Sequence, residues 1–205
     1  MLRRWLGLGV AIVSGLGLAI ELVHGARHGD VVDALLPRLS LSFEGNLPTW
    51  FSSSLLLGCA IAAGAVAAAG APWRRHWWAL AIGFGYASLD EAIELHEQLG
   101  GHLDLGGVLY FDWVVPAIAI LAVLAAVFLP FVRALPSPVR RRLVVAGAIY
   151  VGGALAMELP LGWWTERFGA ESLGYALLDW VEETLEMIGA ALGLLAMVDY
   201  RRGLR

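Results

Sequence analysis

Runs of about twenty residues with few charges recur along this chain, and each is long enough for a helix to cross the hydrocarbon core of a bilayer. This feature constrains the fold more than any motif, because segments of this length and composition predict transmembrane helices. Hydrophobic residues make up 59% of the 205 residues, and the mean hydropathy is +0.71. Such a composition excludes an ordinary soluble domain. The sequence therefore predicts an all-α integral membrane protein.

Six such runs predict a bundle of six transmembrane helices that forms a single domain over residues 1–205. The first run follows the basic sequence MLRRW, but no small-residue cleavage site follows it and Glu21 lies near its outer end. We therefore interpret it as a membrane span rather than as a signal peptide. The stretch VVDALLPRLSL predicts a short helix on the membrane surface. The six expected spans cover residues 5–23, 49–70, 77–97, 108–132, 143–162 and 176–199.

The basic residues predict the orientation of the bundle. The chain contains fourteen arginines and no lysine, and only Arg27, Arg38 and Arg167 lie on the far side of the six-helix topology. The positive-inside rule then places both termini in the cytoplasm. All 18 acids except Asp199 lie in the outer loops or in the outer halves of helices. This separation of charge excludes a nucleic-acid-binding surface.

Acidic residues occur at a common depth in four of the predicted helices. At about 1.5 Å per residue from the cytoplasmic ends, this depth is roughly 20–26 Å. Each acid must point into the bundle, because a charge that faces lipid costs a few kcal/mol. We therefore expect an acidic chamber that opens toward the outer surface. The residues at this depth are Glu21, Asp90, Glu94, Glu158, Glu183 and Glu186.

The helical period places further residues beside these acids. Asp179 and Glu182 share a stripe with Glu183 and Glu186, although the preference of acids for a helix N-terminus also explains both positions. His96 lies about 120° from Asp90 on a regular helix, so it joins the chamber only if the helix bends. The other stripes comprise Asp90, Glu94 and Glu97 with Glu91 at the edge, and Glu21, His24 and His28. Solvated loop or capping roles are expected for His102, Asp104, Asp112, Glu166 and Glu171.

The chamber predicts bound metal. Many carboxylates cannot stay ionised side by side without cations or protons. Carboxylate and imidazole are common ligands of iron, manganese and zinc, so we expect one or more divalent ions. Glu21 and His24 have the Glu-x-x-His spacing of di-iron carboxylate bundles, but the chain has only one such pair, and a solvated helix end is the alternative. The predicted ligands are Glu21, His24, Asp90, Glu91, Glu94, His96, Glu97, Glu158, Glu182, Glu183 and Glu186.

The stretch SLDEAIELHE resembles a set of uncharacterised bacterial multi-pass membrane proteins. These proteins carry Leu-Asp-Glu, four residues and then His-Glu late in one span, often with a later glutamate-rich span such as EETLEM. The resemblance covers mainly residues 88–97 and, more loosely, 182–189. It implies that Asp90, Glu91, His96 and Glu97 belong to the site, and it implies no established activity. A protein of this set is expected in the bacterial cytoplasmic (inner) membrane, with the acids facing the periplasm or exterior.

Three functions remain open on sequence alone, and no catalytic residue is assigned. A membrane metalloenzyme, an oxidoreductase or a hydrolase, would use the acids as metal ligands and act on a lipid-soluble substrate. A non-catalytic subunit of a larger membrane complex would use them to bind a partner, a pigment or a structural cation. A cation or proton transporter would need polar residues that continue to the cytoplasm. The inner halves of the helices offer little beyond Ser14, Tyr86 and Tyr150.

Overall fold

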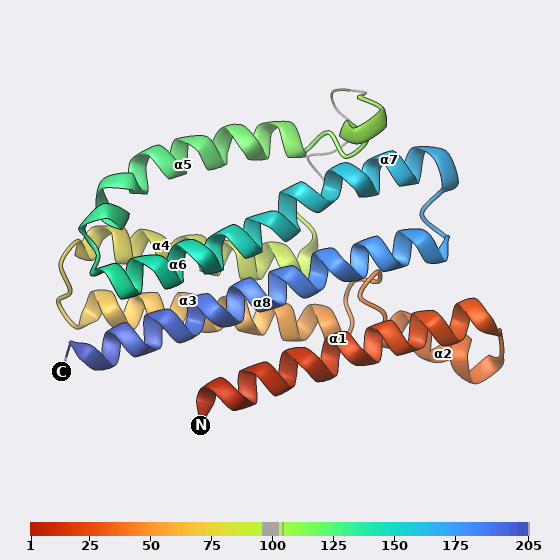
Figure 1. The fold of residues 1–205 in the computed structure, drawn as a ribbon, viewed down its shortest axis with the longest axis horizontal. Helices are drawn as coiled ribbons and strands as arrows, with labels where there is room; N and C mark the ends of the chain where they lie inside the picture. Colours follow the sequence, from red (N-terminus) through yellow and green to blue (C-terminus); the bar gives the residue numbers. More distant parts are fainter. Residues whose placement is uncertain (96–102, 104, 205) are drawn as a thin grey trace.

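The computed structural model describes residues 1–95, 103 and 105–204. This part of the chain is helical and contains no strand, which confirms the predicted all-α class. Figure 1 shows long helices that run side by side, with both termini at the same end of the bundle. The elements in chain order are α1 (Leu2–Ala26), α2 (Asp30–Leu39), α3 (Leu47–Ala68), α4 (Arg74–Ile93), the 3₁₀ turn η2 (Gly107–Leu109), α5 (Val114–Ala134), α6 (Ser137–Val151), the π-helical segment η3 (Gly152–Met157), α7 (Glu158–Phe168) and α8 (Leu173–Gly203).

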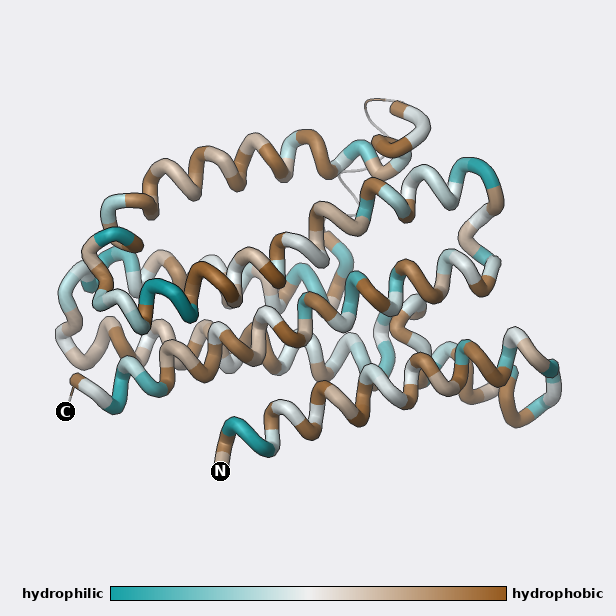
Figure 2. Tube along the Cα trace, in the orientation of Figure 1, coloured by the Kyte–Doolittle hydropathy of each residue, from teal (hydrophilic) through white to brown (hydrophobic). Residues whose placement is uncertain are grey.

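Within the described residues, four helical stretches are long and apolar enough to cross a membrane. They are α1, α3, α5 and the continuous helix Ser137–Phe168, which comprises α6, η3 and α7. These stretches are consistent with insertion in a membrane. The helices α4 and α8 overlap the other two predicted spans, but polar and acidic residues lower their hydropathy, and Figure 2 shows hydrophilic residues interrupting α8. Six spans and cytoplasmic termini therefore remain predictions.

The ends of several helices follow from local sequence signals. Asn46 caps α3 by accepting a hydrogen bond from the Thr49 backbone N–H at 3.1 Å, and Pro48 lies in the first turn. Ser172 caps α8 in the same way through the Tyr175 N–H at 3.3 Å. The predicted short helix is present as α2, and its location on a membrane surface stays a prediction. These caps fix where the long helices start, and therefore which residues lie at each depth of the bundle.

Apolar packing fills the half of the bundle that lies toward the termini. Small side chains on α3 and α8 let the helices approach closely, as expected where packing drives helix association in lipid. At Gly189 an added Cβ would lie 2.6 Å from the backbone nitrogen of Tyr150 on α6, so only glycine allows this contact. The fully buried side chains of this half include Cys59, Ala63, Val66, Trp77, Phe131 and Met197.

Among the four candidate spans, α5 and the Ser137–Phe168 helix have the smallest buried share. Only 11% of the most apolar window of α5 is buried, and Figure 1 shows α5 standing off from α6 along much of its length. Its C-terminal end is anchored by Phe131 and Leu135, which join the apolar core. Large aliphatic side chains along the rest of α5, such as Ile118, Val123 and Val127, are exposed. This helix therefore offers an apolar surface to lipid or to another chain.

Candidate functional site

A cavity of about 680 Å³ lies between the C-terminal part of α4 and the N-terminal half of α8, with η3 and α7 along another side. Carboxylates dominate its lining, and no arginine or histidine lines it among the described residues. Three tyrosines, Tyr110, Tyr150 and Tyr175, also face it. The ten acids that line the cavity are Glu44, Asp90, Glu91, Glu94, Asp112, Glu158, Asp179, Glu182, Glu183 and Glu186.

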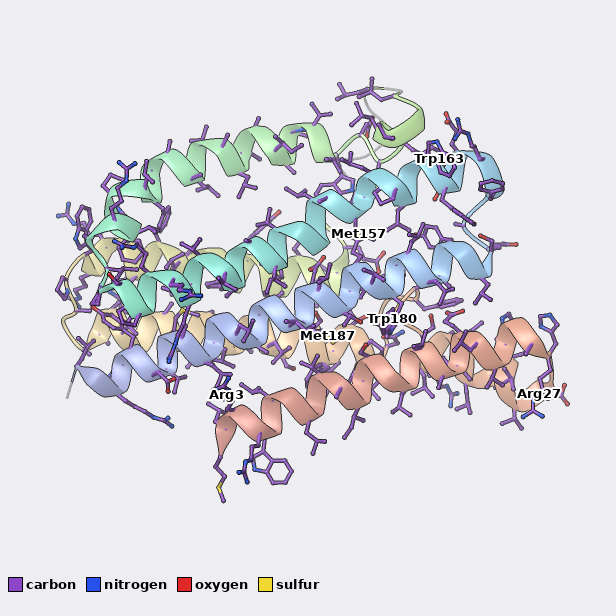
Figure 3. All side chains as sticks on the ribbon, in the orientation of Figure 1. Arg3, Arg27, Met157, Trp163, Trp180 and Met187 are labelled. Carbon is purple, nitrogen blue, oxygen red and sulfur yellow. The ribbon has the colours of Figure 1, made fainter. Side chains whose placement is uncertain are left out.

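The helix α8 contributes four of these acids because its period places every third or fourth residue on one face. Glu182 and Glu186 are each only 7% exposed. On its other side α8 contacts α1: the Trp180 indole N–H donates to the Ser14 carbonyl oxygen at 2.9 Å, and the hydroxyls of Ser14 and Thr184 lie 2.7 Å apart. These contacts set the rotation of α8 about its axis. The glutamates occupy the segment between Trp180 and Met187, which are labelled in Figure 3.

Glu158 reaches the cavity through an irregular helical segment. The π-helical turn Gly152–Met157 interrupts the long Ser137–Phe168 helix and directly precedes Glu158. Such turns shift the side chains that follow them and recur at functional sites. At Gly153 an added Cβ would lie 2.8 Å from the Glu182 carbonyl oxygen and 2.9 Å from the Glu186 Cγ. The absence of a side chain there lets η3 pack directly against the acidic turn of α8, with Glu158 buried beside it.

The helix α4 brings Asp90 and Glu91 to the cavity and is tied there to α3. Ser53 Oγ donates to the Ser88 carbonyl at 2.7 Å, and Ser88 Oγ donates to the Ser53 carbonyl at 2.8 Å. The sequence predicted that this helix continues to residue 97, and this boundary is wrong, because α4 ends at Ile93. Glu94 there adopts a left-handed conformation with φ 55°, and its N–H donates to the Asp90 carbonyl at 2.7 Å.

Two predicted ligands of this segment, His96 and Glu97, lie outside the described residues. The position of His96 was predicted on a regular helix, but α4 ends at Ile93, three residues before it. Glu94 nevertheless lines the cavity, from the turn that closes the helix rather than from a helical stripe. A left-handed glutamate costs about 1 kcal/mol or more, and such conformations cluster at functional sites.

Glu44 and Asp112 reach the cavity from connecting segments. Glu44 accepts a hydrogen bond from the Thr49 hydroxyl at 3.0 Å, at the start of α3. Asp112, which is 2% exposed, accepts one from the Leu103 N–H at 2.6 Å. Asp112 is therefore buried rather than solvated, although its bond to a backbone N–H agrees with the capping role that was the other expectation. One signal could have found it, because an acid inside the aromatic run Tyr110–Trp113 is out of place in a solvated loop.

Acids from three helices approach one another inside the cavity. Glu182 interacts electrostatically with Glu158 on α7, Glu186 on α8 and Glu91 on α4. One carboxylate oxygen of Glu182, Oε2, is buried and meets no hydrogen-bond donor among the described residues. Buried polar atoms almost always have a partner. This oxygen is therefore suited to a bound cation or a proton.

Glu21 and His24 do not line the cavity. Glu21 is buried and accepts a hydrogen bond from the Ser40 hydroxyl, which links α1 to the segment after α2. His24 Nε2 lies 3.7 Å from Asp33 Oδ1 at the start of α2. The structure therefore separates these two predicted ligands from the other seven described ones, and the Glu-x-x-His pair does not face the glutamates of α8.

The described part of the chain is thus an all-helical protein with apolar candidate spans and an internal carboxylate-lined cavity. It matches the family described as "Domain of unknown function (DUF8692)" over residues 32–200, and it belongs to that family. The matched region contains every acid that lines the cavity and excludes Glu21, His24 and His28. No curated protein and no solved structure matches the chain significantly.

Proposed function

We propose that this protein is a membrane metalloenzyme that holds one or two divalent ions in the carboxylate-lined cavity. The observation that carries the proposal is the convergence of ten carboxylates on one cavity without a lining arginine or histidine in the described part of the chain. Buried like charges this close need cations or protons to compensate them. Divalent ions supply two charges each and bind several carboxylates at once.

The buried acids supply a suitable set of ligands. Glu158, Glu182 and Glu186 come from two helices that pack in direct contact at Gly153, so their relative positions are set by backbone packing. The Glu182 Oε2 atom accepts no hydrogen bond from the described residues, so it is available to bind a metal ion. Asp90 and Glu91 complete the ring from α4. Carboxylate oxygens suit hard divalent ions such as manganese best, and iron and zinc also accept them as ligands.

The size of the cavity favours catalysis over a purely structural ion. One water occupies about 30 Å³ of liquid volume, so an ion with its water ligands fills a small part of about 680 Å³. The remainder is in the range of small-molecule pockets, roughly 300–1,000 Å³. Phe111 and Trp113 provide an apolar part of the lining. A lipid-soluble substrate of modest size therefore fits beside the metal, for an oxidation or a hydrolysis.

We further propose that the protein lies in the bacterial cytoplasmic membrane, with six spans and cytoplasmic termini. The helix ends support this orientation, because the arginine-rich ends of α6 and α8 lie at the end of the bundle where both termini lie. Arg3 and Arg27 mark opposite ends of α1 in Figure 3, and the first has Arg4 beside it. The cavity then opens to the periplasm or exterior.

Transport of cations or protons is less well supported. It needs polar groups across the whole bundle, and the half toward the termini is packed with apolar side chains such as Val66, Phe131 and Met197. A role as a subunit of a larger complex is favoured by one observation, the exposed apolar surface of α5. Purification from the native membrane separates that alternative, since an obligate subunit would co-purify with its partners at fixed stoichiometry.

Metal content of the purified protein tests the proposal. We expect the wild-type chain to bind about one or two more equivalents of iron, manganese or zinc than the variant Glu182→Gln with Glu186→Gln. The matched control changes two exposed acids, Glu166→Gln with Glu171→Gln, and should keep the metal. A folded wild-type protein that stays metal-free after incubation with these metals would overturn the proposal.

A further inference from the structure

A second group of metal-binding side chains lies at the corner between α1 and α2, outside the cavity. His24 belongs to the last turn of α1, His28 to the connection, and Asp33 to the first turn of α2. Their side chains are 30%, 76% and 51% exposed, respectively. The sequence placed His24 with the acids of the other helices, whereas the structure gives it different neighbours.

The three side chains converge on a common point. The Asp33 Oδ1 atom lies 3.7 Å from His24 Nε2 and 3.9 Å from His28 Nδ1. One ligand atom of each residue lies within 4.8 Å of the other two. These separations are too long for hydrogen bonds. Ligand atoms at about 2.0–2.1 Å from a tetrahedral zinc ion are roughly 3.4 Å apart, so small side-chain movements would accommodate the ion.

The preference of acids for a helix N-terminus explains the position of Asp33 alone. It does not explain two imidazole nitrogens directed at the same carboxylate oxygen. The two rings lie edge to face with centroids 4.6 Å apart, so they also occupy one small region. Two imidazoles and one carboxylate suit zinc and other first-row transition metals far better than magnesium or calcium.

Buried contacts at the C-terminal end of α2 hold α2 against α1 independently of any ion. The Ser40 hydroxyl donates to Glu21 one turn before His24. At Gly17 an added Cβ would lie 3.1 Å from the Leu39 carbonyl oxygen at the end of α2, so the two helices are packed closely. The three ligands therefore extend from a fixed hairpin, and binding needs to order only side chains.

We propose that His24, His28 and Asp33 form a surface site for a zinc-class transition-metal ion, separate from the cavity. The three protein ligands leave at least one coordination position open to solvent, because all three side chains are partly exposed. Such a site binds its ion reversibly at the outer end of the bundle. It depends on residues that the cavity does not use, so it does not rest on the proposed enzyme activity.

Zinc titration of the purified, chelator-treated protein tests this site. The background is the Glu182→Gln, Glu186→Gln variant, so that the cavity does not contribute. We expect one zinc ion per chain, at least about tenfold weaker binding after Asp33→Asn, and loss of the ion after His28→Ala or His24→Ala. Magnesium should not bind at this position.

The matched control is His76→Ala, which changes a histidine stacked on Phe131 at the other end of the bundle and should leave zinc binding unchanged. His28 is mostly exposed, so its replacement does not threaten folding. Equal zinc stoichiometry and affinity with and without His24 and His28 would overturn the proposal. If the Glu182→Gln, Glu186→Gln variant binds zinc and loses it when His28→Ala is added, the surface site is supported. This result holds even if the cavity itself proves metal-free.

Discussion

Glu182 has one buried carboxylate oxygen without a hydrogen-bond donor in the described residues, and acids from three helices surround it. A protein selected only for stability would not keep this arrangement, since a buried charge without a partner is strongly unfavourable. Functional sites commonly retain such local instability. At the scale of single residues, the buried acids therefore destabilise the metal-free protein, and a bound cation would reverse this effect.

Glu182→Gln should change metal-free and metal-bound protein in opposite directions. The amide removes a buried charge, so the metal-free variant should be more stable by about 1–2 kcal/mol. It also removes a proposed ligand, so the increase in unfolding temperature on adding metal should shrink. Thermal unfolding in detergent with and without metal measures both effects, with Glu171→Gln as the exposed control. A variant that is less stable without metal, and unchanged in its response to metal, would contradict this interpretation.

Ser40→Ala should destabilise the protein without affecting the cavity. The change leaves the buried Glu21 carboxylate without its hydrogen-bond donor, which costs about 1–3 kcal/mol. Denaturant or thermal unfolding measures the loss, and Ser54→Ala, at an exposed position, should be close to neutral. Retained metal content in the cavity would agree with a structural role for Glu21. Loss of cavity metal would instead place Glu21 in the metal site.

Individual residues show how far the sequence could predict the site. Helical depth and period identified Asp90, Glu158, Glu183 and Glu186 as neighbours, and all four line one cavity. The rotation of α1 could not be obtained this way, because period fixes which residues share a stripe but not which helix that stripe faces. Glu44 and Asp112 were not predicted because they lie in connections, whose path depends on tertiary packing.

At the scale of elements, the π-helical segment η3 determines how α7 presents Glu158 to α8. Its sequence, Gly152 to Met157, reads as an ordinary stretch of membrane helix, so neither the π turn nor its position could be predicted. The end of α4 at Ile93 was also not predictable, because most residues of SLDEAIELHE are good helix formers and the stretch contains no glycine or proline. Both irregularities lie next to acids of the cavity.

Gly153→Ala should separate η3 from α8. The added Cβ would meet the Glu182 carbonyl oxygen at 2.8 Å, so backbone must move, at a cost of about 1–3 kcal/mol. Gly152→Ala is a matched control in the same segment, because its Cβ would meet nothing within 4 Å. We expect lower unfolding temperature and reduced metal content only for the first variant. Equal behaviour of the two variants would show that this packing does not position Glu158.

At the scale of the whole molecule, the bundle has two unlike halves. The half toward the termini is an apolar core of small and aromatic residues, and the other half holds the carboxylate cavity. The exposed arginines gather mainly at the first half. This polarity predicts which end faces the cytoplasm. The helices α4 and α8 carry most of the cavity acids, and this explains why hydropathy alone identifies α1, α3, α5 and the Ser137–Phe168 helix but not these two.

The orientation can be measured with single cysteines in a Cys59→Ala background. Glu171→Cys, between α7 and α8, should react in intact cells with a thiol reagent that does not cross membranes. Arg141→Cys, near the start of α6, should react only after the membrane is permeabilised. Both positions are exposed, so access depends on the side of the membrane. The reverse pattern would show that the cavity faces the cytoplasm and would exclude the proposed orientation.

Anomalous X-ray diffraction from crystals of the purified protein grown with iron, manganese or zinc would test the cavity most directly. Data collected on either side of the absorption edge of the bound metal locate that metal without assumptions about ligands. We expect a peak in the cavity, at about 2.0–2.2 Å from carboxylate oxygens that include those of Glu158, Glu182 or Glu186. A well-ordered cavity with no anomalous peak, or with a peak only at His24, His28 and Asp33, would contradict a metal centre among these acids.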